Sequence, residues 1–163
     1  MKKYYGLVLL LAMMAKPVFA EATISGQVPE GQNAQQIVNI IEKFLLAAMA
    51  KDAETTALYL ADDAKIIFTG PRVFERPTDV GKFNATRYKS VKKDITRWDM
   101  TYEADRLIVY CIGTLYGKWL DGTDFEGDRF IDRFEIVDGK ITMIEVWNDS
   151  AEMLLIKAGL AKP

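Results

Sequence analysis

Two acidic residues in the second half of the chain have the spacing of a proton-transfer pair. Asp138-Gly139 separates two runs rich in β-branched and aromatic residues, which predicts a β-hairpin with a two-residue loop. In that hairpin Val137 faces Lys140, and pairing the strands residue by residue sets Asp132 directly opposite Glu145. Because opposite residues share one face of a sheet, we predict that the two carboxyl groups lie side by side.

The other side chains predicted for this face are apolar, which would perturb both acids. A second hairpin, with Asp121-Gly122 as its loop, sets Cys111 opposite Asp132, and Gly113 leaves room beside them. Burial and mutual repulsion raise the pKa of a carboxyl group, so two such neighbours share a proton near neutral pH. We therefore predict Asp132 and Glu145 as catalytic residues that act as general acid and base.

Two other interpretations of the pair stay open. An arginine could neutralise both carboxyl groups, and the pair would then be structural. A β-bulge could also turn one acid to the opposite face of the sheet, because one inserted residue reverses the alternation of side chains.

The same face predicts a pocket for a small apolar or aromatic ligand. Its walls would come from the paired strands and the strand before them, and a predicted helix would add a tyrosine and an arginine. Arg72 and Arg76, on a loop at the expected mouth, are further candidate cations. The predicted substrate-binding residues are Trp98, Met100, Tyr102, Tyr88, Arg87, Cys111, Phe130, Phe134, Met143 and Trp147.

Composition excludes several kinds of active site. The chain has no histidine, which rules out a Ser-His-Asp or Cys-His apparatus and a histidine-built zinc site. Cys111 is the only cysteine, so it can form neither an internal disulfide nor a thiolate metal site. The sequence has no glycine-rich phosphate-binding loop. We expect no metal and no cofactor.

The first 20 residues have the features of a cleavable signal peptide. Met1-Lys2-Lys3 is positively charged, residues 6–15 are apolar, and Val18 and Ala20 are small residues before the expected cleavage site. About ten apolar residues are too few for a membrane anchor, which needs roughly 20. We expect export to the periplasm or the medium, without membrane attachment after cleavage. Cleavage removes three lysines from a chain of net charge −2, leaving −5, which argues against nucleic acid as a partner.

Residues 34–163 predict one α+β domain, preceded by a flexible leader over residues 21–33. Helices come first, and an antiparallel meander of four strands follows. We expect the N-terminal helices to wrap a cone-shaped, curled sheet whose open end forms the pocket. The predicted helices are Ala34–Lys51, Ala53–Leu60, Thr78–Asp94 and Ala151–Ala158, and the predicted strands are Ala64–Thr69, Thr96–Ala104, Leu107–Leu120, Phe125–Val137 and Lys140–Trp147.

The opposite face of the second meander strand is unusually apolar for a surface in water. It carries Tyr110, Ile112, Thr114 and Tyr116. We expect a homodimer through this outer face of the sheet. The alternative is that the C-terminal segment of the same chain covers it.

After the signal peptide, nearly the whole chain resembles the SnoaL-like, nuclear transport factor 2-like superfamily. The resemblance implies a curled-sheet fold with cystatin-like topology. Members of the superfamily include isomerases, dehydratases, polyketide cyclases, epoxide hydrolases and non-catalytic binders. The resemblance rests on Leu60-Ala61-Asp62-Asp63-Ala64, Phe130-Ile131-Asp132-Arg133-Phe134, Asp138-Gly139-Lys140-Ile141 and Val146-Trp147-Asn148-Asp149-Ser150-Ala151.

Steroid isomerases of this superfamily allow one comparison at the level of residues. They have an inward aspartate in an Ile-Asp-x-Phe context, which Asp132 matches, and there the protonated acid donates a hydrogen bond to an oxyanion. The helix tyrosine of that site falls at Phe44, and the base before a proline falls at Gly70. The residue facing the inward aspartate is small and apolar in those enzymes and is Glu145 here, which could supply the base. The resemblance therefore implies the fold but not that mechanism.

Two functions follow from these observations. The first is an exported, cofactor-independent lyase or isomerase that transfers a proton on a hydrophobic or aromatic small molecule. The second is an exported protein of the same fold that binds such a molecule without turnover. A dyad that is open to the pocket favours catalysis, whereas a dyad neutralised by arginine favours binding or a structural role.

Overall fold

The computed structural model describes residues 22–70 and 72–162, so the predicted signal peptide lies outside the described residues. No helix within these two ranges is long and apolar enough to cross a membrane. The elements are β1 (Thr23–Gly26), α1 (Ala34–Met49), α2 (Ala53–Ala57), β2 (Leu60–Phe68), β3 (Arg72–Phe74), α3 (Pro77–Asn84), β4 (Tyr88–Glu103), β5 (Arg106–Trp119), β6 (Asp124–Val137), β7 (Lys140–Asn148) and α4 (Ser150–Lys157).

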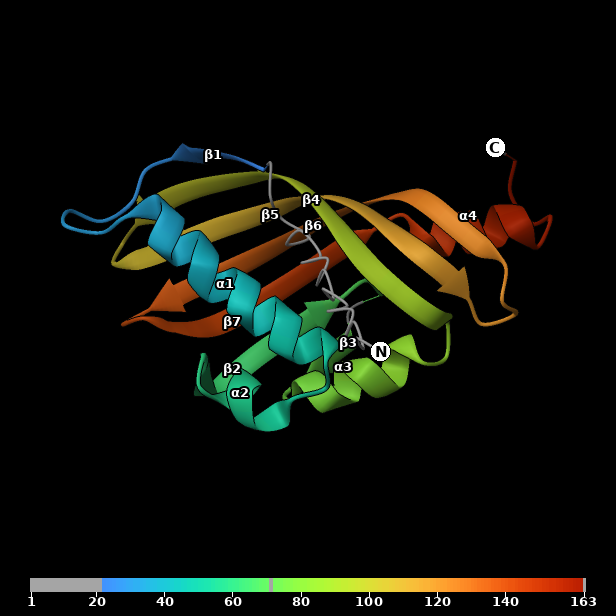
Figure 1. The fold of residues 1–163 in the computed structure, drawn as a ribbon, viewed down its shortest axis with the longest axis horizontal. Coiled ribbons are helices and arrows are strands. Elements are labelled where there is room, and N and C mark those ends of the chain that lie inside the picture. Colours follow the sequence, from blue (N-terminus) through green and yellow to red (C-terminus); the bar gives the residue numbers. More distant parts are fainter. Residues whose placement is uncertain (1–21, 71, 163) are drawn as a thin grey trace, which may run out of the picture.

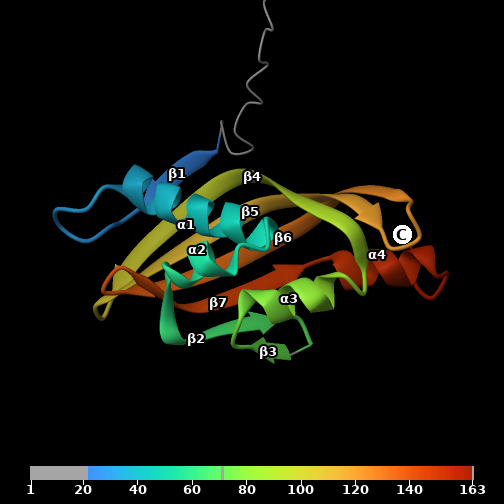
Figure 2. The same cartoon turned by 60° about the horizontal axis from the view of Figure 1, so that its bottom comes forward.

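One curled, mixed sheet forms the framework (Figures 1 and 2), with the strand order β1-β4-β5-β6-β7-β2-β3. The four central strands are the predicted antiparallel meander. β1 adds to one side in parallel with β4, and β2 adds to the other side in parallel with β7. The α+β class and the curled sheet are confirmed. The leader contains β1, a strand that the sequence did not predict.

α1 supplies most of the helical contribution to the core, and it lies across one face of the sheet (Figure 1). Its buried side chains recur at helical spacing from Ile37 to Ala47, and Asn33 caps its first turn by accepting a hydrogen bond from the Gln36 backbone N–H. The Phe44 ring packs edge-on against Phe134 of β6, with the centroids 6.3 Å apart. By contrast, α3 buries no residue and α2 buries only Thr56. The inner face of the sheet is therefore covered mainly by α1.

The predicted helix Thr78–Asp94 is too long, because residues 88–94 belong to β4. α3 ends at Asn84, and the chain then enters the strand at Tyr88. Irregular pairing between Tyr88 and Ser90, and again between Ile95 and Arg97, interrupts the strict alternation of side chains. Without a clean period of two, the sequence of this segment is hard to distinguish from a helix.

The hairpin registers decide which side chains enter the interior, and the β5–β6 register is confirmed at its centre. Cys111 pairs with Asp132, and Gly113 pairs with Phe130. The turn itself differs, because the Trp119 N–H bonds to the Thr123 carbonyl, and a bulge between Leu115 and Gly117 compensates for that shift. The shift at the turn and the bulge therefore cancel, and the predicted register is restored before Asp132.

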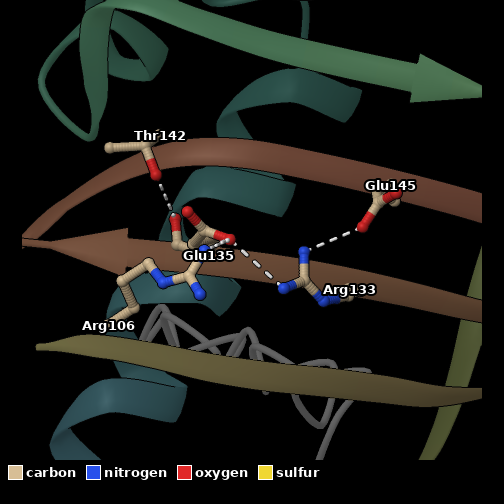
Figure 3. A network of polar contacts seen from close by, with 5 residues as sticks. All are labelled: Arg106, Arg133, Glu135, Thr142 and Glu145. Carbon is tan, nitrogen blue, oxygen red and sulfur yellow. Dashed lines mark hydrogen bonds and ion pairs between the residues drawn. The ribbon is translucent and has the colours of Figure 1, made fainter. Parts of the chain in front are cut away.

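The predicted β6–β7 register is wrong beyond the first two residue pairs. Ile136 faces Ile141 as expected, but Glu135 then faces Met143, which leaves Thr142 as an inserted residue. The Thr142 hydroxyl donates to the Glu135 carbonyl at 3.2 Å (Figure 3). From this bulge onward every β7 side chain has changed face. Asp132 therefore faces Val146 instead of Glu145.

Gly113 does not leave room for a ligand, because the backbone of β4 lies against it. A Cβ atom added at this position would lie 1.9 Å from the Asp94 carbonyl oxygen. We predict that Gly113→Ala lowers the free energy of unfolding by about 1–3 kcal/mol, since β4 and β5 must separate to accept the methyl group. Chemical denaturation measures this change.

The matched control is Gly81→Ala on α3, where an added Cβ meets nothing within 4 Å. The free energy of unfolding of that variant should stay unchanged or rise by about 0.5–1 kcal/mol, because alanine favours the helix. Equal stability of Gly113→Ala and wild type would contradict the close approach of the two strands.

Candidate functional site

A cavity of about 420 Å³ lies between α1, α3 and the inner face of the sheet. Most of its wall is apolar, and the polar side chains include one aspartate, one tyrosine and several lysines. Its charged side chains are Asp132 of β6, Lys93, Lys89 and Lys92 of β4, and Lys51 beyond α1. The apolar wall includes Phe44, Leu45, Ala48 and Met49 of α1, Ile66 and Phe68 of β2, Val80 of α3, Leu115 of β5, and Ile144 and Val146 of β7.

Lys93 and Asp132 form a buried ion pair in the wall of this cavity. The Lys93 Nζ lies 2.6 Å from Asp132 Oδ2, and the two side chains are 17% and 3% exposed. The same ammonium lies 3.7 Å from the centroid of the Phe130 ring, a cation–π contact that holds it over the sheet. The apolar cavity therefore contains one fixed positive charge and one carboxyl group.

The second oxygen of the Asp132 carboxyl group is buried and has no hydrogen-bond partner among the described residues. Burial raises the pKa of Asp132 above its usual range, and the charge and hydrogen bond of Lys93 oppose that rise. Such a carboxyl group is a stronger base than one in water. Asp132 as a residue lines the cavity, so its carboxyl group is the candidate acceptor of a proton or a hydrogen bond from a ligand.

Cys111, opposite Asp132, is fully buried and does not line the cavity. Burial raises the pKa of its thiol well above the usual value, and the neighbouring Asp132 raises it further. The thiol therefore stays protonated and is a packing group in the core.

A second buried carboxyl group, which the sequence analysis missed, lies on the same face of β6. Asp128 is fully buried, and its Oδ2 accepts a hydrogen bond from the Ser150 hydroxyl of α4. The Ser150 oxygen in turn accepts a hydrogen bond from the Tyr88 hydroxyl. Residues 128, 130 and 132 alternate with the outer residues Arg129 and Ile131, so extending the predicted face by one pair would have found Asp128.

Glu145 lies outside the cavity, on the outer face of the sheet, because of the bulge at Thr142. There the Arg133 Nη1 lies 2.8 Å from Glu145 Oε2, and Arg133 also pairs with Glu135 at 3.2 Å. Figure 3 shows this network, which Arg106 extends by a 3.4 Å contact with Glu135. The prediction that Asp132 and Glu145 lie side by side is wrong. The bulge, left open as an alternative, accounts for the difference, whereas an arginine that neutralises both acids is not found, because Arg133 pairs with Glu145 and Asp132 pairs with Lys93.

Of the predicted substrate-binding residues, only Tyr88 lines the cavity. Met143 and Trp147 follow Glu145 to the outer face, where Trp147 is 45% exposed. Tyr102 lies at the end of β4 and is 40% exposed. The residues that lie in the buried core, away from the cavity, are Trp98, Met100, Cys111, Phe130 and Phe134.

The candidate arginines do not enter the cavity. Arg87 lies over the Phe83 ring at 4.4 Å, and Arg72 lies 5.0 Å from the centroid of the same ring. Arg76 pairs with Asp79 at the start of α3. The buried cation is Lys93, which was missed because the segment that contains it was predicted to be helical. Nowhere in the described ranges do three Cys, Asp or Glu side chains gather closely enough to hold a metal ion.

We predict that Lys93→Met destabilises the protein in a pH-dependent way. Removal of the ammonium leaves the buried Asp132 without its partner, which costs about 3–5 kcal/mol when the carboxyl group is charged. The folded-state pKa of Asp132, already raised by burial, rises further. A raised carboxyl pKa means that stability is lost as pH rises through it, so the deficit should be larger at about pH 8 than at about pH 5.

Urea denaturation at both pH values measures this deficit. The control is Lys93→Met/Asp132→Leu, which removes both charges and should recover most of the loss at the higher pH. A deficit that is independent of pH, or that persists in the double variant, would show that Lys93 acts through packing alone.

The structure is similar to several solved structures. A candidate SnoaL-like polyketide cyclase from Jannaschia sp. has a TM-score of 0.59 at 17% identity, with 85% of this chain and 100% of that chain covered. A candidate ketosteroid isomerase from Shewanella frigidimarina has a TM-score of 0.54 at 18% identity, with 67% and 92% covered.

A nuclear transport factor 2-like protein of unknown function from Burkholderia pseudomallei has a TM-score of 0.57 at 16% identity, with 72% and 94% covered. No protein-family model and no curated protein matches the sequence. The curled sheet, the helix across it and these similarities agree with the fold that the resemblance seen in the sequence implies. The chain has the nuclear transport factor 2-like fold.

Proposed function

We propose that the protein binds a small apolar molecule with a carbonyl group in the cavity and transfers a proton on it, using its own side chains. The observation that carries this proposal is the Lys93–Asp132 ion pair, because both of its residues line an apolar cavity. Two proteins of the same fold are named as candidate enzymes acting in isomerisation and cyclisation, which supports the reaction class.

Each group of the pair has a role in such a reaction. The ligand's apolar body would lie against Leu115, Ile144 and Val146. The Asp132 carboxyl group would remove the proton next to the carbonyl, because burial raises the pKa of this group and makes it a better base. The Lys93 ammonium, which has two N–H groups beyond the one used by Asp132, would stabilise the enolate oxygen.

The enolate then recovers a proton from Asp132 at the same carbon or, where a conjugated double bond in the substrate makes it a dienolate, at the γ carbon. The first outcome returns the substrate, and the second isomerises it. This cycle requires one carboxyl group in the cavity, so Glu145 has no part in it. The carboxyl group returns one proton for each proton that it removes, and its exchange with solvent between the two transfers would bring deuterium to the substrate carbon in deuterium oxide.

Binding without turnover is the second candidate function. It is favoured by the hydrogen bond that already joins Lys93 to Asp132 at 2.6 Å, because a satisfied pair could fix the orientation of a polar group without moving a proton. The two functions make opposite predictions about exchange of hydrogen next to a carbonyl group.

Exchange of carbon-bound hydrogen tests proton transfer without knowledge of the natural substrate. We predict that the protein accelerates exchange of the α-hydrogens of β-tetralone in deuterium oxide, measured by proton NMR. Asp132→Asn should slow the catalysed exchange by about a hundredfold or more, since it removes the base.

Glu145→Gln is the matched control, because it makes the same carboxyl-to-amide change on the outer face, and it should keep the exchange rate. Binding of β-tetralone without any acceleration of exchange would favour the non-catalytic function. Equal rates for Asp132→Asn and wild type would remove Asp132 from the mechanism.

We further propose that the protein is exported and forms a homodimer through the outer face of the sheet. The predicted signal peptide supports export. On the outer face Ile112, Ile131 and Trp147 are consecutive cross-strand partners on β5, β6 and β7, beside Tyr110 and Tyr116. Ile131 is 41% exposed and Trp147 is 45% exposed in the isolated chain. An exposed apolar row of this kind is typical of subunit interfaces.

We predict that Ile131→Lys converts the dimer into a monomer, because it places a charge in the centre of this row. Sedimentation velocity of the mature protein measures the change. Leu160→Lys is the control, since Leu160 is 77% exposed beyond α4 and should leave the dimer intact. A wild-type protein that sediments as a monomer would contradict the proposed interface.

A further inference from the structure

A chain of three buried side chains leads from the cavity wall to Asp128. The Tyr88 hydroxyl donates to the Ser150 oxygen, and the Ser150 hydroxyl donates to Asp128 Oδ2. Asp128 and Ser150 are fully buried, and Tyr88 is 7% exposed. Tyr88 is at the same time one of the residues that line the cavity. The chain therefore connects a ligand site to a carboxyl group that no ligand can touch directly.

Packing alone does not explain a carboxyl group at this position. Asp128 Oδ1 is buried without a hydrogen-bond partner among the described residues, and an ionised carboxylate in that state is costly. The neighbouring inner positions of β6 are Phe125 and Phe130, which shows that the site accepts apolar side chains. The protonated form of Asp128 avoids most of this cost.

The direction of the hydrogen bonds depends on whether Asp128 holds a proton. When Asp128 is ionised, Tyr88 donates to Ser150 and Ser150 donates to Asp128, so the single Tyr88 proton is in use. When Asp128 is protonated on Oδ2, it donates to Ser150, and the Ser150 hydroxyl turns to donate to Tyr88. The Tyr88 hydroxyl proton is then no longer used by Ser150 and is available to another acceptor.

We propose that Asp128, Ser150 and Tyr88 form a hydroxyl relay that makes Tyr88 a hydrogen-bond donor to the ligand only while Asp128 is protonated. The proposal rests on the proposed function and adds to it a substrate class, because it requires a ligand with a second oxygen acceptor besides the one near Lys93. Tyr88 is then a ligand-binding residue, and Asp128 is a positioning residue that acts through Ser150.

The charges around the relay are consistent with this assignment. Burial raises the pKa of Asp128, and the Ser150 hydrogen bond, the Asp149 backbone N–H and the charge of Lys93 lower it, while the charge of the Asp149 carboxylate raises it. Burial also raises the pKa of Tyr88, with Asp128 acting in the same direction and Ser150 and Arg87 opposing. Tyr88 therefore keeps its proton and can serve as a donor, while Asp128 is the group that titrates.

Anthraquinone and anthrone provide a matched pair of probes, because anthrone lacks one of the two opposed carbonyl groups. Trp119, which stacks on Tyr88 at 5.3 Å, reports binding through quenching of its fluorescence. In the wild type the affinity advantage of anthraquinone over anthrone should be roughly tenfold in acid and should disappear as pH rises through the pKa of Asp128.

Three variants separate the relay from a structural role. Asp128→Asn places an amide donor next to Ser150, which imitates the protonated acid, so the advantage should persist at every pH. Ser150→Ala and Tyr88→Phe should remove the affinity advantage of anthraquinone over anthrone at every pH. Tyr102→Phe is the control, since Tyr102 lies outside the cavity, and it should keep the wild-type profile.

Any pH dependence that survives in Asp128→Asn belongs to Asp132, which lines the same cavity. Equal affinity of the two probes at all pH values in the wild type would overturn the relay while leaving the proposed function intact. The same holds if Asp128→Asn and Ser150→Ala keep the wild-type profile, in which case the three side chains only fasten α4 to the sheet. Failure of both probes to bind the wild type, together with absence of β-tetralone exchange, would overturn both proposals.

Discussion

The alternation of side chains along β6 is the constraint on which the rest of the site depends. Every inner residue of this strand is fixed by its pairing with β5 on one side and β7 on the other. One inserted residue, Thr142, lets β7 curl around the core and simultaneously exchanges its two faces. Asp132 consequently enters the interior with Val146 opposite it, and Glu145 meets Arg133 on the outer face. The same irregularity thus shapes the sheet and leaves Asp132 without a second carboxylate opposite.

Because Asp132 faces Val146 and not Glu145, the cause of its pKa shift differs from the predicted one. Opposite Glu145, the carboxyl group would have been perturbed by repulsion, and the pair would have shared a proton. Opposite Val146, it is perturbed by burial, and the Lys93 ammonium from β4 offsets part of that cost. A buried ion pair contributes little net stability compared with apolar side chains of the same size. Its persistence inside an apolar cavity is therefore better explained by what it does to a ligand than by what it does for the fold.

The sequence predicts the central meander, a helix that begins at Ala34 and the inward position of Asp132, because these depend on local patterns. Asp138-Gly139 and the apolar period of α1 are strong signals, and each is satisfied by nearby residues. The bulges at Thr142 and near Ser90 are not visible in the sequence, since they arise from the curvature that the sheet needs to close over α1. A register error of one residue was enough to move Glu145, Met143 and Trp147 out of the predicted site. Because residues 88–94 were predicted to be helical, Lys93 was not predicted to face the pocket.

Charge balance links the two buried aspartates of β6. Asp128 and Asp132 lie on the same face, with Phe130 between them, and the one cation acting on both is Lys93, which is held over the Phe130 ring. One ammonium can neutralise only one of two buried carboxylates, so the interior favours a state in which the second acid holds a proton. Lys93 donates its hydrogen bond to Asp132, which therefore keeps the charge more readily. In the proposed relay the proton is on Asp128, which hydrogen bonds connect through Ser150 to Tyr88. The two acids are thus distinguished by their partners, one suited to accept a proton and the other to supply a hydrogen-bond donor, although they share one strand and one face.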